Sequence, residues 1–436
     1  MKKAMVFGAG KSGLTAKKIL EKNQYEVILV DDKVAMSSKE AIELLDEIEI
    51  FVKSPGVPYV ELVRKAMEKN IPIIGEIELS FRELRKTNND TKIIAITGTN
   101  GKTTTTAKTA ELLEFAGFKS IACGNIGKPF GEVVLEDKKY DYIVIELSSF
   151  QLENIDSFRS DIAALINLTP DHLERYNSIE EYYDVKFNVG KNQKFSDKFI
   201  LNFDNKESLK RIDRISGEIL GVTTAKDKEK YLFLENNSIM YKTEEIININ
   251  ELSLKGKHNL ENMLFLIAIA KIVGISNDIL KEYLMTARPI EHRLEGFFSY
   301  GEVQFINDSK ATNVDSTKFA IEAYPESILI CGGKDKHLDI TDLGKLIADN
   351  NMAEVYLIGE NRYIILEKLK MYSYPENRIF DVENIDNCMK ILKNRLNPEK
   401  AQVVLFSPAT SSYDQFDNFE DRGIKFKEIV RKYFGG

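Results

Sequence analysis

The sequence predicts an α/β protein of three domains, built around mostly parallel sheets. Three observations point to this fold class. A length of 436 residues corresponds to about three domains of ordinary size. Glycine-rich turns join an apolar strand to a helix at residues 8–13 and again at 98–101. In the last third of the chain, apolar strands alternate with helical segments, which is typical of a parallel sheet.

The first expected elements are a strand over residues 4–8, a glycine-rich turn over 8–13, a helix, and a second strand over 25–30. The turn has the Gly-x-Gly-x-x-Gly spacing, and the acidic pair 31–32 follows about 20 residues later. Such a turn binds a diphosphate next to a ribose-like sugar. NAD or FAD is the usual ligand of this motif. A glycine-rich turn that only packs a helix on a strand is the alternative without a ligand.

Residues 51–57 are expected to form a strand that ends in a turn, and residues 71–75 a further short strand. The polar run 82–91 has few apolar side chains and is predicted to be a linker. We place the first domain boundary there. The expected domains cover residues 1–90, 91–290 and 291–436.

The second block opens with the strand 92–97, the turn 98–101 and a helix that begins near Lys102. Glycines let the backbone curl so that its N–H groups converge on an anion, and the start of the helix adds its dipole. Lys102 would reach the terminal phosphates of a nucleotide, and the Thr103 hydroxyl would bind Mg²⁺. The strict phosphate-loop pattern has a glycine where this chain has Ile96. An ordinary strand-to-helix turn is the alternative.

Two further apolar strands, 140–145 and 162–168, are followed by polar residues. Open α/β sheets bind ligands at the carboxyl ends of their strands. Glu146 is therefore expected to hold Mg²⁺, with a solvated strand-end carboxylate as the alternative. His172 follows the second strand, where a surface or packing role is the alternative. Lys186 lies between aromatic residues on an expected helix, where it could also be a lysine whose stem is buried and whose amine reaches water.

Residues 199–255 contain short strands typical of an antiparallel sheet edge. A long helix is expected over 259–273. Asn259 and Asn262 share one face near its start, which would suit an adenine or phosphate contact. Helix capping is the alternative for Asn259.

The third block begins near residue 290. Asp308 and Lys310 follow its first strand, so that this block could deliver Arg293 and Lys310 to phosphates. Two more polar loops at strand ends, 332–336 and 407–414, offer hydroxyls and a cation that could hold an acidic small molecule. The expected strands of this block cover residues 303–306, 327–330, 355–358, 379–382 and 403–406.

Composition limits the possible partners. The chain carries 60 Lys+Arg and 68 Asp+Glu, a net charge of −8, which argues against broad nucleic-acid binding. Its three cysteines have no metal-ligand spacing. No run of about 20 apolar residues is present, and no signal peptide is recognised, so a cytoplasmic location is expected.

These residues resemble the Mur ligases over nearly the whole chain. Segment 97–104 matches the phosphate-loop variant of that family, which accounts for Ile96. Segments 146–152, 307–313 and 407–423 resemble the branch that adds D-glutamate. The resemblance implies a Rossmann-like first domain for a UDP moiety, a central ATPase domain of phosphate-loop type, and a Rossmann-like third domain for the amino acid. Asp32 stands where Thr is common in the family, a departure that bears on contacts at the uracil end.

The resemblance also implies roles for individual residues. The expected ATP-binding residues are Gly98, Thr99, Asn100, Gly101, Lys102, Thr103, Thr104, Asn259, Asn262, Arg293 and Asp308. Those near the uridine diphosphate are Ser12, Asp31 and Lys33, and those near the muramoyl group are Asn125 and Gln151. The D-glutamate pocket would be lined by Thr312, Lys336, Ser412 and Phe419. The metal sites would involve Thr103, Glu146, His172 and Lys186, and the catalytic residues would be Lys102, His172 and Lys186.

The implied reaction joins D-glutamate to UDP-N-acetylmuramoyl-L-alanine through an acyl phosphate, with ATP and two Mg²⁺ ions. A carbamate formed from CO₂ on Lys186 would act as a carboxylate-like metal ligand. Small molecules are the expected partners of a chain that is expected to be a monomer, to bind no nucleic acid and to span no membrane.

Four alternative functions are considered for the sequence. Folylpolyglutamate synthase has a similar central domain but lacks a unit like residues 1–90. Mur ligases that add L-alanine or a diamino acid differ in the amino acid that they activate. A nicotinamide-dependent dehydrogenase would have no use for Lys102 and Thr103. A nucleic-acid-dependent ATPase is disfavoured by the acidic balance and by the absence of tryptophan.

Overall fold

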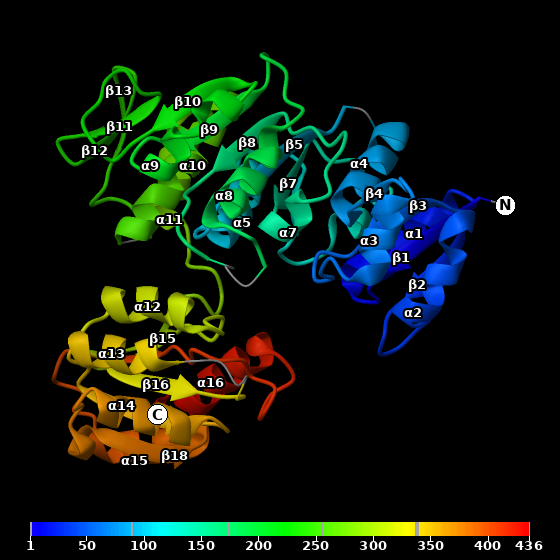
Figure 1. Ribbon diagram of the computed structural model, residues 1–436. Coiled ribbons are helices and arrows are strands. Elements are labelled where there is room, and N and C mark those ends of the chain that lie inside the picture. The colour runs from blue at the N-terminus through cyan, green and yellow to red at the C-terminus, as the bar shows by residue number, and fades with distance from the viewer. Residues whose placement is uncertain (1, 89, 172–174, 255, 336–339, 436) are drawn as a thin grey trace. The chain divides into compact units, whose positions relative to one another are not determined.

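Three sheets, each largely or wholly parallel, form the framework of the chain (Figure 1). The computed structural model describes residues 2–435 except 89, 172–174, 255 and 336–339. The chain divides into two compact units, Met1–Ala287 and Arg288–Gly436, and the first unit contains two of the sheets. The expected α/β fold class is confirmed. The three domain boundaries drawn from the sequence remain predictions.

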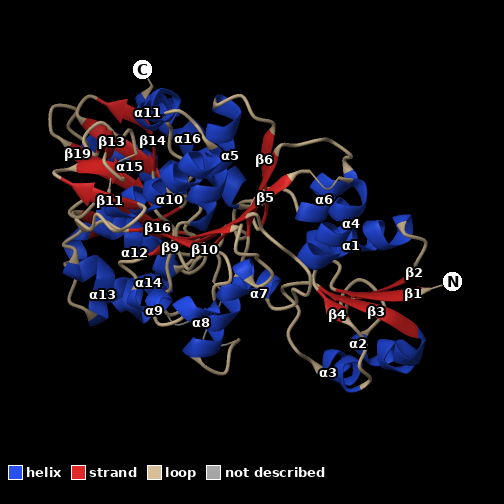
Figure 2. Cartoon of the chain, turned by 90° about the horizontal axis from the view of Figure 1, so that it is seen from above, coloured by secondary structure: helices blue, strands red, loops and turns tan. Residues whose placement is uncertain are grey.

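The first sheet has four parallel strands in the order β2-β1-β3-β4. Helix α1 covers one face, where Ala16 and Ile19 are buried, and α2 and α3 cover the other (Figure 2). The strand order reverses between β1 and β3, which makes the loops after these two strands the expected ligand site of this sheet. The elements are β1 (Lys3–Phe7), α1 (Lys11–Lys22), β2 (Glu26–Val30), α2 (Ser38–Ala41), η1 (Ile42–Glu47), β3 (Ile48–Lys53), α3 (Glu61–Glu68) and β4 (Ile73–Ile74).

The linker expected over residues 82–91 is wrong for most of its length. Helix α4 (Glu76–Thr87) continues through it. Ile77, Phe81 and Leu84 recur at helical spacing and are buried in the core next to the second sheet. The composition of the run hid this periodicity, because its apolar residues lie mostly upstream of residue 82.

The second sheet has nine strands in the order β13-β12-β11-β10-β9-β8-β5-β7-β6. Its strands are parallel from β6 to β11, and β11 to β13 form an antiparallel edge. The antiparallel edge predicted over residues 199–255 is therefore confirmed for β11 to β13 and wrong for β9 and β10, which pair parallel. The strands are β5 (Lys92–Thr97), β6 (Ser120–Gly124), β7 (Tyr142–Glu146), β8 (Ile162–Leu165), β9 (Lys198–Asn202), β10 (Glu218–Val222), β11 (Leu232–Glu235), β12 (Ser238–Tyr241) and β13 (Glu244–Asn248).

The helices of this part of the chain cover both faces of the nine-stranded sheet. The predicted long helix is present as α10, and it packs with α5 in one hydrophobic cluster. The helices are α5 (Lys102–Phe115), α6 (Phe130–Leu135), α7 (Ser149–Leu152), α8 (Ile179–Phe187), η2 (Asn188–Gly190), α9 (Lys206–Leu209), η3 (Ile212–Arg214), α10 (Lys257–Val273) and α11 (Asn277–Thr286).

The second unit is built on a six-stranded sheet in the order β14-β15-β19-β16-β17-β18. The five strands predicted for it are present and parallel, and the additional strand β14 pairs antiparallel with β15. The elements are β14 (Glu295–Tyr300), β15 (Val303–Asn307), α12 (Val314–Ala323), β16 (Ile328–Gly332), α13 (Thr341–Asp349), β17 (Glu354–Ile358), α14 (Arg362–Met371), η4 (Glu376–Arg378), β18 (Ile379–Glu383), α15 (Ile385–Arg395), β19 (Gln402–Phe406) and α16 (Phe419–Phe434).

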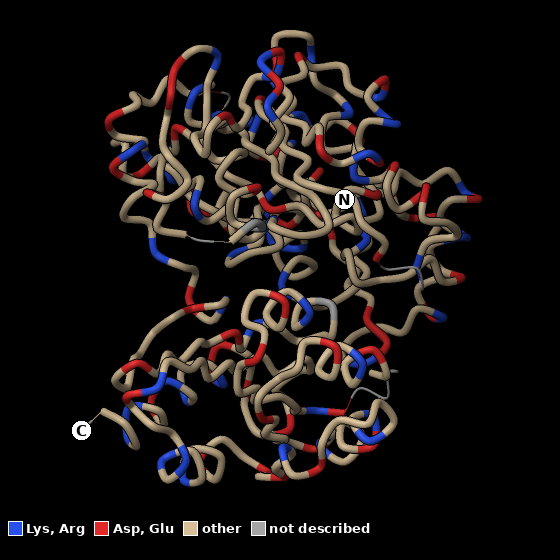
Figure 3. Tube along the Cα trace, turned by 90° about the vertical axis from the view of Figure 1, so that its left-hand side faces the viewer, with Lys and Arg blue, Asp and Glu red and all other residues tan. Residues whose placement is uncertain are grey.

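Charged residues of both signs alternate along the chain, as Figure 3 shows, instead of collecting by sign in separate segments. Within the described residues, none of the helices combines the length and the apolar character that crossing a bilayer requires.

Candidate active site

The turn between β5 and α5 has the backbone geometry of an anion cradle. Gly98 and Gly101 have positive φ angles, +153° and +82°. A Cβ atom on Gly101 would lie 2.2 Å from Oδ1 of Asn262. Both glycines are therefore required for this tight turn. Since the first N–H groups of a helix have no partner within the helix, the start of α5 offers donors to an anion at this position.

The loop after β8 braces this turn, which the sequence did not predict. The N–H of Thr99 donates to the Asn167 carbonyl and the N–H of Asn100 donates to Asn167 Oδ1, both at 2.9 Å. The Thr99 hydroxyl also donates to the carbonyl of Thr169 at 3.1 Å. Asn167 therefore shapes the turn from the loop after β8, and its place near the end of the expected strand 162–168 was the only signal for it.

Two lysines converge on one carbonyl of the turn. Lys102 Nζ donates to the carbonyls of Gly98 and Thr99 at 3.0 and 2.8 Å, and Lys186 Nζ donates to the Gly98 carbonyl at 2.9 Å. Lys186 is 2% exposed, and its ammonium lies 4.6 Å from the centroid of the Tyr182 ring. Burial, and secondarily the charge of Lys102, hold the pKa of Lys186 well below its usual range. The alternative that the amine of Lys186 reaches water is therefore wrong.

Glu146 ends β7 next to this turn in the sheet, because β5 and β7 are paired. Its side chain is buried, and Oε1 accepts a hydrogen bond from Asn125 Nδ2 at 2.9 Å. Oε2 is buried and has no hydrogen-bond partner among the residues that the structure describes. A buried carboxylate oxygen of this kind is a suitable ligand for a hard cation such as Mg²⁺, and the alternative of a solvated carboxylate is wrong.

The two asparagines of α10 differ in their surroundings. Asn262 is buried and lies against the turn, where Oδ1 accepts a hydrogen bond from Thr105 Oγ1 at 3.4 Å. Asn259 is half-buried. The helix begins at Lys257 after Gly256, so Asn259 is not its N-cap. Thr103 and Thr104, in the first turn of α5, are buried. The prediction for His172 falls outside the described residues.

In the first sheet, the loops after β1 and β3 meet at the point where the strand order reverses. A Cβ on Gly13 would lie 1.8 Å from the Gly8 carbonyl oxygen, so only glycine fits there. The Ser54 hydroxyl donates to the same carbonyl at 3.2 Å. Asp31 accepts the N–H groups of Ala9 and Lys33 at 2.8 and 3.0 Å, and these bonds lower its pKa. Asp31 thus fixes the backbone of this loop.

Ser12 and Lys33, which were expected near the uridine diphosphate, differ in exposure: Ser12 in the first turn of α1 is half-buried and Lys33 is exposed. Gln151 is buried in α7, where its Oε1 accepts hydrogen bonds from the N–H and the hydroxyl of Ser148 at 2.9 and 3.0 Å. The side-chain amide oxygen of Gln151 is therefore part of the cap at the start of this short helix.

In the second unit, Asp308 lies at the end of β15 in a buried polar network. Ser407 Oγ donates to Asp308 Oδ2 at 2.7 Å, and burial raises the pKa of Asp308 to about 7, against the opposing effects of Ser407 and Arg293. Nη1 of Arg293 is buried, and none of the described residues gives it a hydrogen bond. Arg422, which had no expected role, donates to the Ser309 hydroxyl and carbonyl at 3.0 and 2.8 Å. The network joins the loops after β15 and β19.

Three residues of the expected amino-acid pocket lie on these loops or next to them. Thr312 is half-buried, Ser412 is buried, and Phe419 opens α16. The Ser309 hydroxyl donates to the Phe419 carbonyl at 2.8 Å, which links the start of α16 to the loop after β15. The prediction for Lys336 lies outside the described residues.

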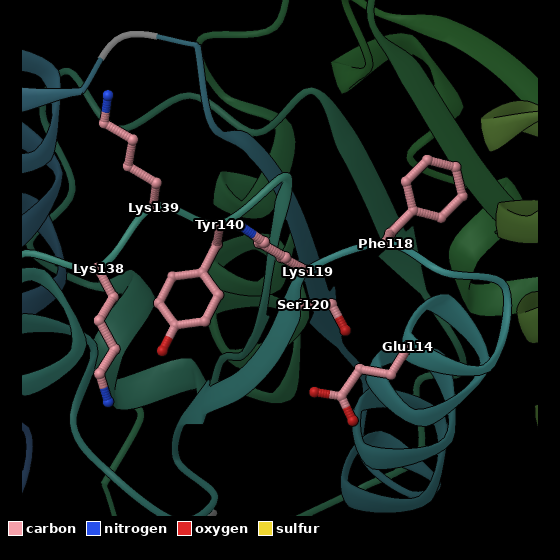
Figure 4. A pocket seen from close by; sticks show the side chains of 7 residues that line it. All are labelled: Glu114, Phe118, Lys119, Ser120, Lys138, Lys139 and Tyr140. Atoms are coloured by element: carbon pink, nitrogen blue, oxygen red, sulfur yellow. The ribbon is translucent and has the colours of Figure 1, made fainter.

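A cavity of about 520 Å³ lies elsewhere on the second sheet and is shown in Figure 4. Its lining includes Lys119 and Ser120 before and at the start of β6, and Tyr140 shortly before β7. These are the amino ends of parallel strands, whereas the phosphate turn and Glu146 lie at the carboxyl ends. The cavity is therefore separate from the candidate site.

Comparison with known proteins gives matches over the full chain. The family model described as the Mur ligase middle domain matches residues 96–270. A UDP-N-acetylmuramoylalanine–D-glutamate ligase from Fusobacterium nucleatum is 50% identical over 435 residues and covers 100% of both chains. A ligase of the same name from Caldanaerobacter subterraneus is 36% identical over 448 residues, 98% of each chain.

Solved structures share the fold at low sequence identity. A UDP-N-acetylmuramate-alanine ligase from Thermotoga maritima matches 99% of each chain with a TM-score of 0.60 and 19% identity. MurF from Acinetobacter baumannii matches 90% of this chain and 87% of its own with a TM-score of 0.62 and 16% identity. At these identities the likeness concerns the fold alone.

Proposed function

Since this chain belongs to the family of UDP-N-acetylmuramoylalanine–D-glutamate ligases, we propose that it joins D-glutamate to UDP-N-acetylmuramoyl-L-alanine at the expense of ATP, giving ADP and phosphate. The reaction is a step of peptidoglycan precursor synthesis. The observation that most supports this function is the convergence of the phosphate turn, the buried Lys186 and the buried Glu146 at the carboxyl edge of one sheet.

ATP is proposed to bind with its phosphates on the turn before α5. The turn and the first threonines of α5 supply backbone and hydroxyl donors, and Lys102 supplies a cation. Lys102 already lies over the turn, 3.0 Å from the Gly98 carbonyl. The residues proposed for ATP are Gly98, Thr99, Asn100, Gly101, Lys102, Thr103, Thr104, Asn259, Asn262, Arg293 and Asp308.

Mg²⁺ fits the chemistry of this edge of the sheet. Glu146 offers a buried carboxylate oxygen to which no described residue donates a hydrogen bond, and Thr103 offers a hydroxyl in the first turn of α5. We propose these two residues, with His172 and a modified Lys186, for two Mg²⁺ ions. When bound, the ions would offset repulsion between the phosphates and the substrate carboxylate.

Lys186 has the properties of a lysine that reacts with CO₂. Because its pKa is held low, the amine is more readily neutral, and only the neutral amine is a nucleophile. Its nitrogen would bond to the carbon of CO₂ and release a proton, which yields a carbamate anion. The proposed product would replace an unfavourable buried cation with an anion able to bind a metal ion.

The sugar nucleotide is proposed to bind with its UDP end at the reversal point of the first sheet, next to Ser12, Asp31 and Lys33. Its muramoyl end would contact Asn125 and Gln151. The second unit is proposed to bind D-glutamate with Thr312, Lys336, Ser412 and Phe419. We further propose three domains over residues 1–90, 91–290 and 291–436, in a cytoplasmic, monomeric enzyme.

The chemistry proceeds in two steps. The terminal carboxylate of the sugar nucleotide attacks the γ-phosphorus of ATP, and ADP leaves with the electrons of the broken P–O bond. The amine of D-glutamate then attacks the acyl carbon, and phosphate leaves as the amide forms. Lys102 would stabilise the charge that develops on the transferred phosphoryl group, while the backbone of the turn holds the triphosphate in line.

The test is phosphate release with ATP and UDP-N-acetylmuramoyl-L-alanine. We expect D-glutamate to support turnover, and L-glutamate and L-alanine to support none. If the protein instead joins L-alanine to the sugar nucleotide that lacks alanine, it has the activity of the Mur ligases that add L-alanine.

A further inference from the structure

A buried carboxylate, Glu153, joins the first sheet to the second. Its side chain is 6% exposed and follows α7 in the second sheet's domain. Lys53, the last residue of β3 in the first sheet, donates to Glu153 Oε2 at 3.2 Å. Arg175, beyond β8, donates to both carboxylate oxygens at 2.9 and 2.8 Å, and the hydroxyl of Tyr176 donates to Oε1 at 3.0 Å. The side chain of Lys53 is fully buried, and that of Arg175 is 14% exposed.

The same two cations hold the loop that follows β3. Lys53 Nζ donates to the Val57 carbonyl at 3.0 Å, and Arg175 does so at 3.4 Å. The loop 54–57 contacts the glycine-rich turn of the first sheet through the hydrogen bond from Ser54 to Gly8. A displacement of Val57 would therefore reach the turn on which the UDP end of the substrate is proposed to bind.

Glu153 lies two residues after Gln151, the proposed muramoyl contact. Gln151 is fixed within α7 by its bonds to Ser148, so α7 carries both groups as one rigid turn. The Glu153 carboxylate thereby connects the element proposed for one end of the substrate with the loop next to the other end.

We propose that Lys53, Glu153 and Arg175 are positioning residues. They hold the loop 54–57, next to the proposed UDP site, at a fixed distance from α7, so that both ends of the sugar nucleotide bind at once. The inference rests on the proposed function. None of the three side chains needs to touch the substrate. A ligand with two binding ends gains affinity when both subsites are held at the correct separation, and it loses that gain when the subsites move independently.

The experiment compares ligands that use one subsite or both. In Lys53→Met, Arg175 remains to pair with Glu153, so no buried carboxylate loses all its partners. Calorimetric titration is expected to show the Kd of UDP-N-acetylmuramoyl-L-alanine raised about 10-fold or more, the scale of a lost second attachment. The Kd of UDP alone is expected to stay within about twofold, because UDP uses one subsite. In kinetics, KM for the sugar nucleotide should rise more than kcat falls, and KM for ATP should be unchanged.

Arg159→Met is the matched control. It breaks another ion pair, partly buried, in which Arg159 donates to both oxygens of Asp197 at 2.7 Å within the second sheet's domain. It is expected to leave both Kd values unchanged. If Lys53→Met does not fold, Glu153→Gln removes the shared charge at nearly constant shape and should give the same pattern.

An equal loss of affinity for UDP and for the full sugar nucleotide would overturn the inference, because it would indicate local damage to the UDP site. Unchanged affinity for both ligands would overturn it as well. Failure of the unaltered protein to bind UDP-N-acetylmuramoyl-L-alanine would contradict the proposed function itself, and is thus distinguishable from failure of the inference.

Discussion

Lys102 and Lys186 donate to the same carbonyl of Gly98, yet their surroundings suit them to different tasks. Lys102 lies at the start of α5, over the turn proposed to hold phosphates, whereas Lys186 is 2% exposed. Burial lowers the pKa of Lys186 most, and the nearby ammonium of Lys102 lowers it further.

Replacing Lys102 with alanine tests the phosphate turn. We expect Lys102→Ala to lower ATP-dependent turnover by a factor of about 100 or more, because a cation on the transferred phosphoryl group is lost. Phosphate release measures the effect. Binding of the sugar nucleotide should be unchanged, and the exposed Lys92→Ala is the control. Activity of Lys102→Ala equal to that of the unaltered protein would remove the turn from the site.

Replacing Lys186 with alanine tests the carbamate. We expect Lys186→Ala to lose turnover and to recover part of it when a short carboxylic acid such as acetate is added, since a free carboxylate can take the place of the missing anion. Acetate should not activate Lys102→Ala, which serves as the control. Rescue by methylamine in place of acetate would show that the function needs a cation, and would contradict the carbamate.

Glu146 is the residue whose metal role can be tested most directly. Glu146→Gln keeps an oxygen to accept from Asn125 but removes the charge. We expect the Mg²⁺ concentration for half-maximal turnover to rise about 10-fold or more, the scale found when metal sites lose supporting groups. A Mg²⁺ titration at saturating ATP measures it, and an unchanged midpoint would argue against a metal at this residue.

At the scale of elements, the sequence predicted most strands and the turns after them, because apolar runs and glycines are local features. It did not predict β14, because Phe297 and Phe298 are adjacent and half-buried and the register shifts between Gly296 and Phe298, so no regular alternation marks this strand. It also assigned part of α4 to a linker. Asn167 was not predicted either, because its role depends on the pairing of β8 with β5, a contact between strands more than 60 residues apart.

Helix α4 carries a buried acid that sequence composition would place at the surface. Glu76 is 1% exposed and accepts hydrogen bonds from the Gly131 N–H and the Ser80 hydroxyl. Burial raises its pKa to about 7, and those two hydrogen bonds oppose the rise. The folded state therefore binds the proton more tightly than the unfolded state, so the stability contributed by this group is present at low pH and is lost as the pH rises towards 7.

The pH dependence of unfolding tests this helix. Between pH 4.5 and 8, we expect Glu76→Gln to gain about 3 kcal/mol of stability relative to the unaltered protein, since each pKa unit corresponds to about 1.4 kcal/mol. Urea unfolding at the two pH values measures the difference. Glu61→Gln, at an exposed position of α3, measures the effect of charge alone. A difference that does not vary with pH would contradict a proton on Glu76.

At the scale of the whole molecule, the first two sheets belong to one unit because side chains of α4 reach into the second. The Glu78 carboxylate is fully buried and accepts the N–H groups of Asp156, Ser157 and Phe158 at 3.0, 2.9 and 2.8 Å. Leu135 of α6 packs on the cluster formed by the first sheet and α1. Such distant contacts leave no local pattern in the sequence, which is why the contact between the first two sheets was not predicted.

Each unit has hydrophobic clusters of its own, and within the described residues no cluster contains members of both. We therefore expect two transitions in calorimetric unfolding of the full chain.

UDP at about 100 times its Kd adds about 2.7 kcal/mol to the free energy of unfolding of the unit that binds it, which corresponds to a rise of roughly 5 °C in the Tm of that unit. Only the transition of residues 1–287 should move, because the proposed UDP site lies on the first sheet. D-glutamate alone is the corresponding ligand for the second unit, and it is expected to raise the Tm of that unit only. A single transition that both ligands raise equally would mean that the two units unfold together.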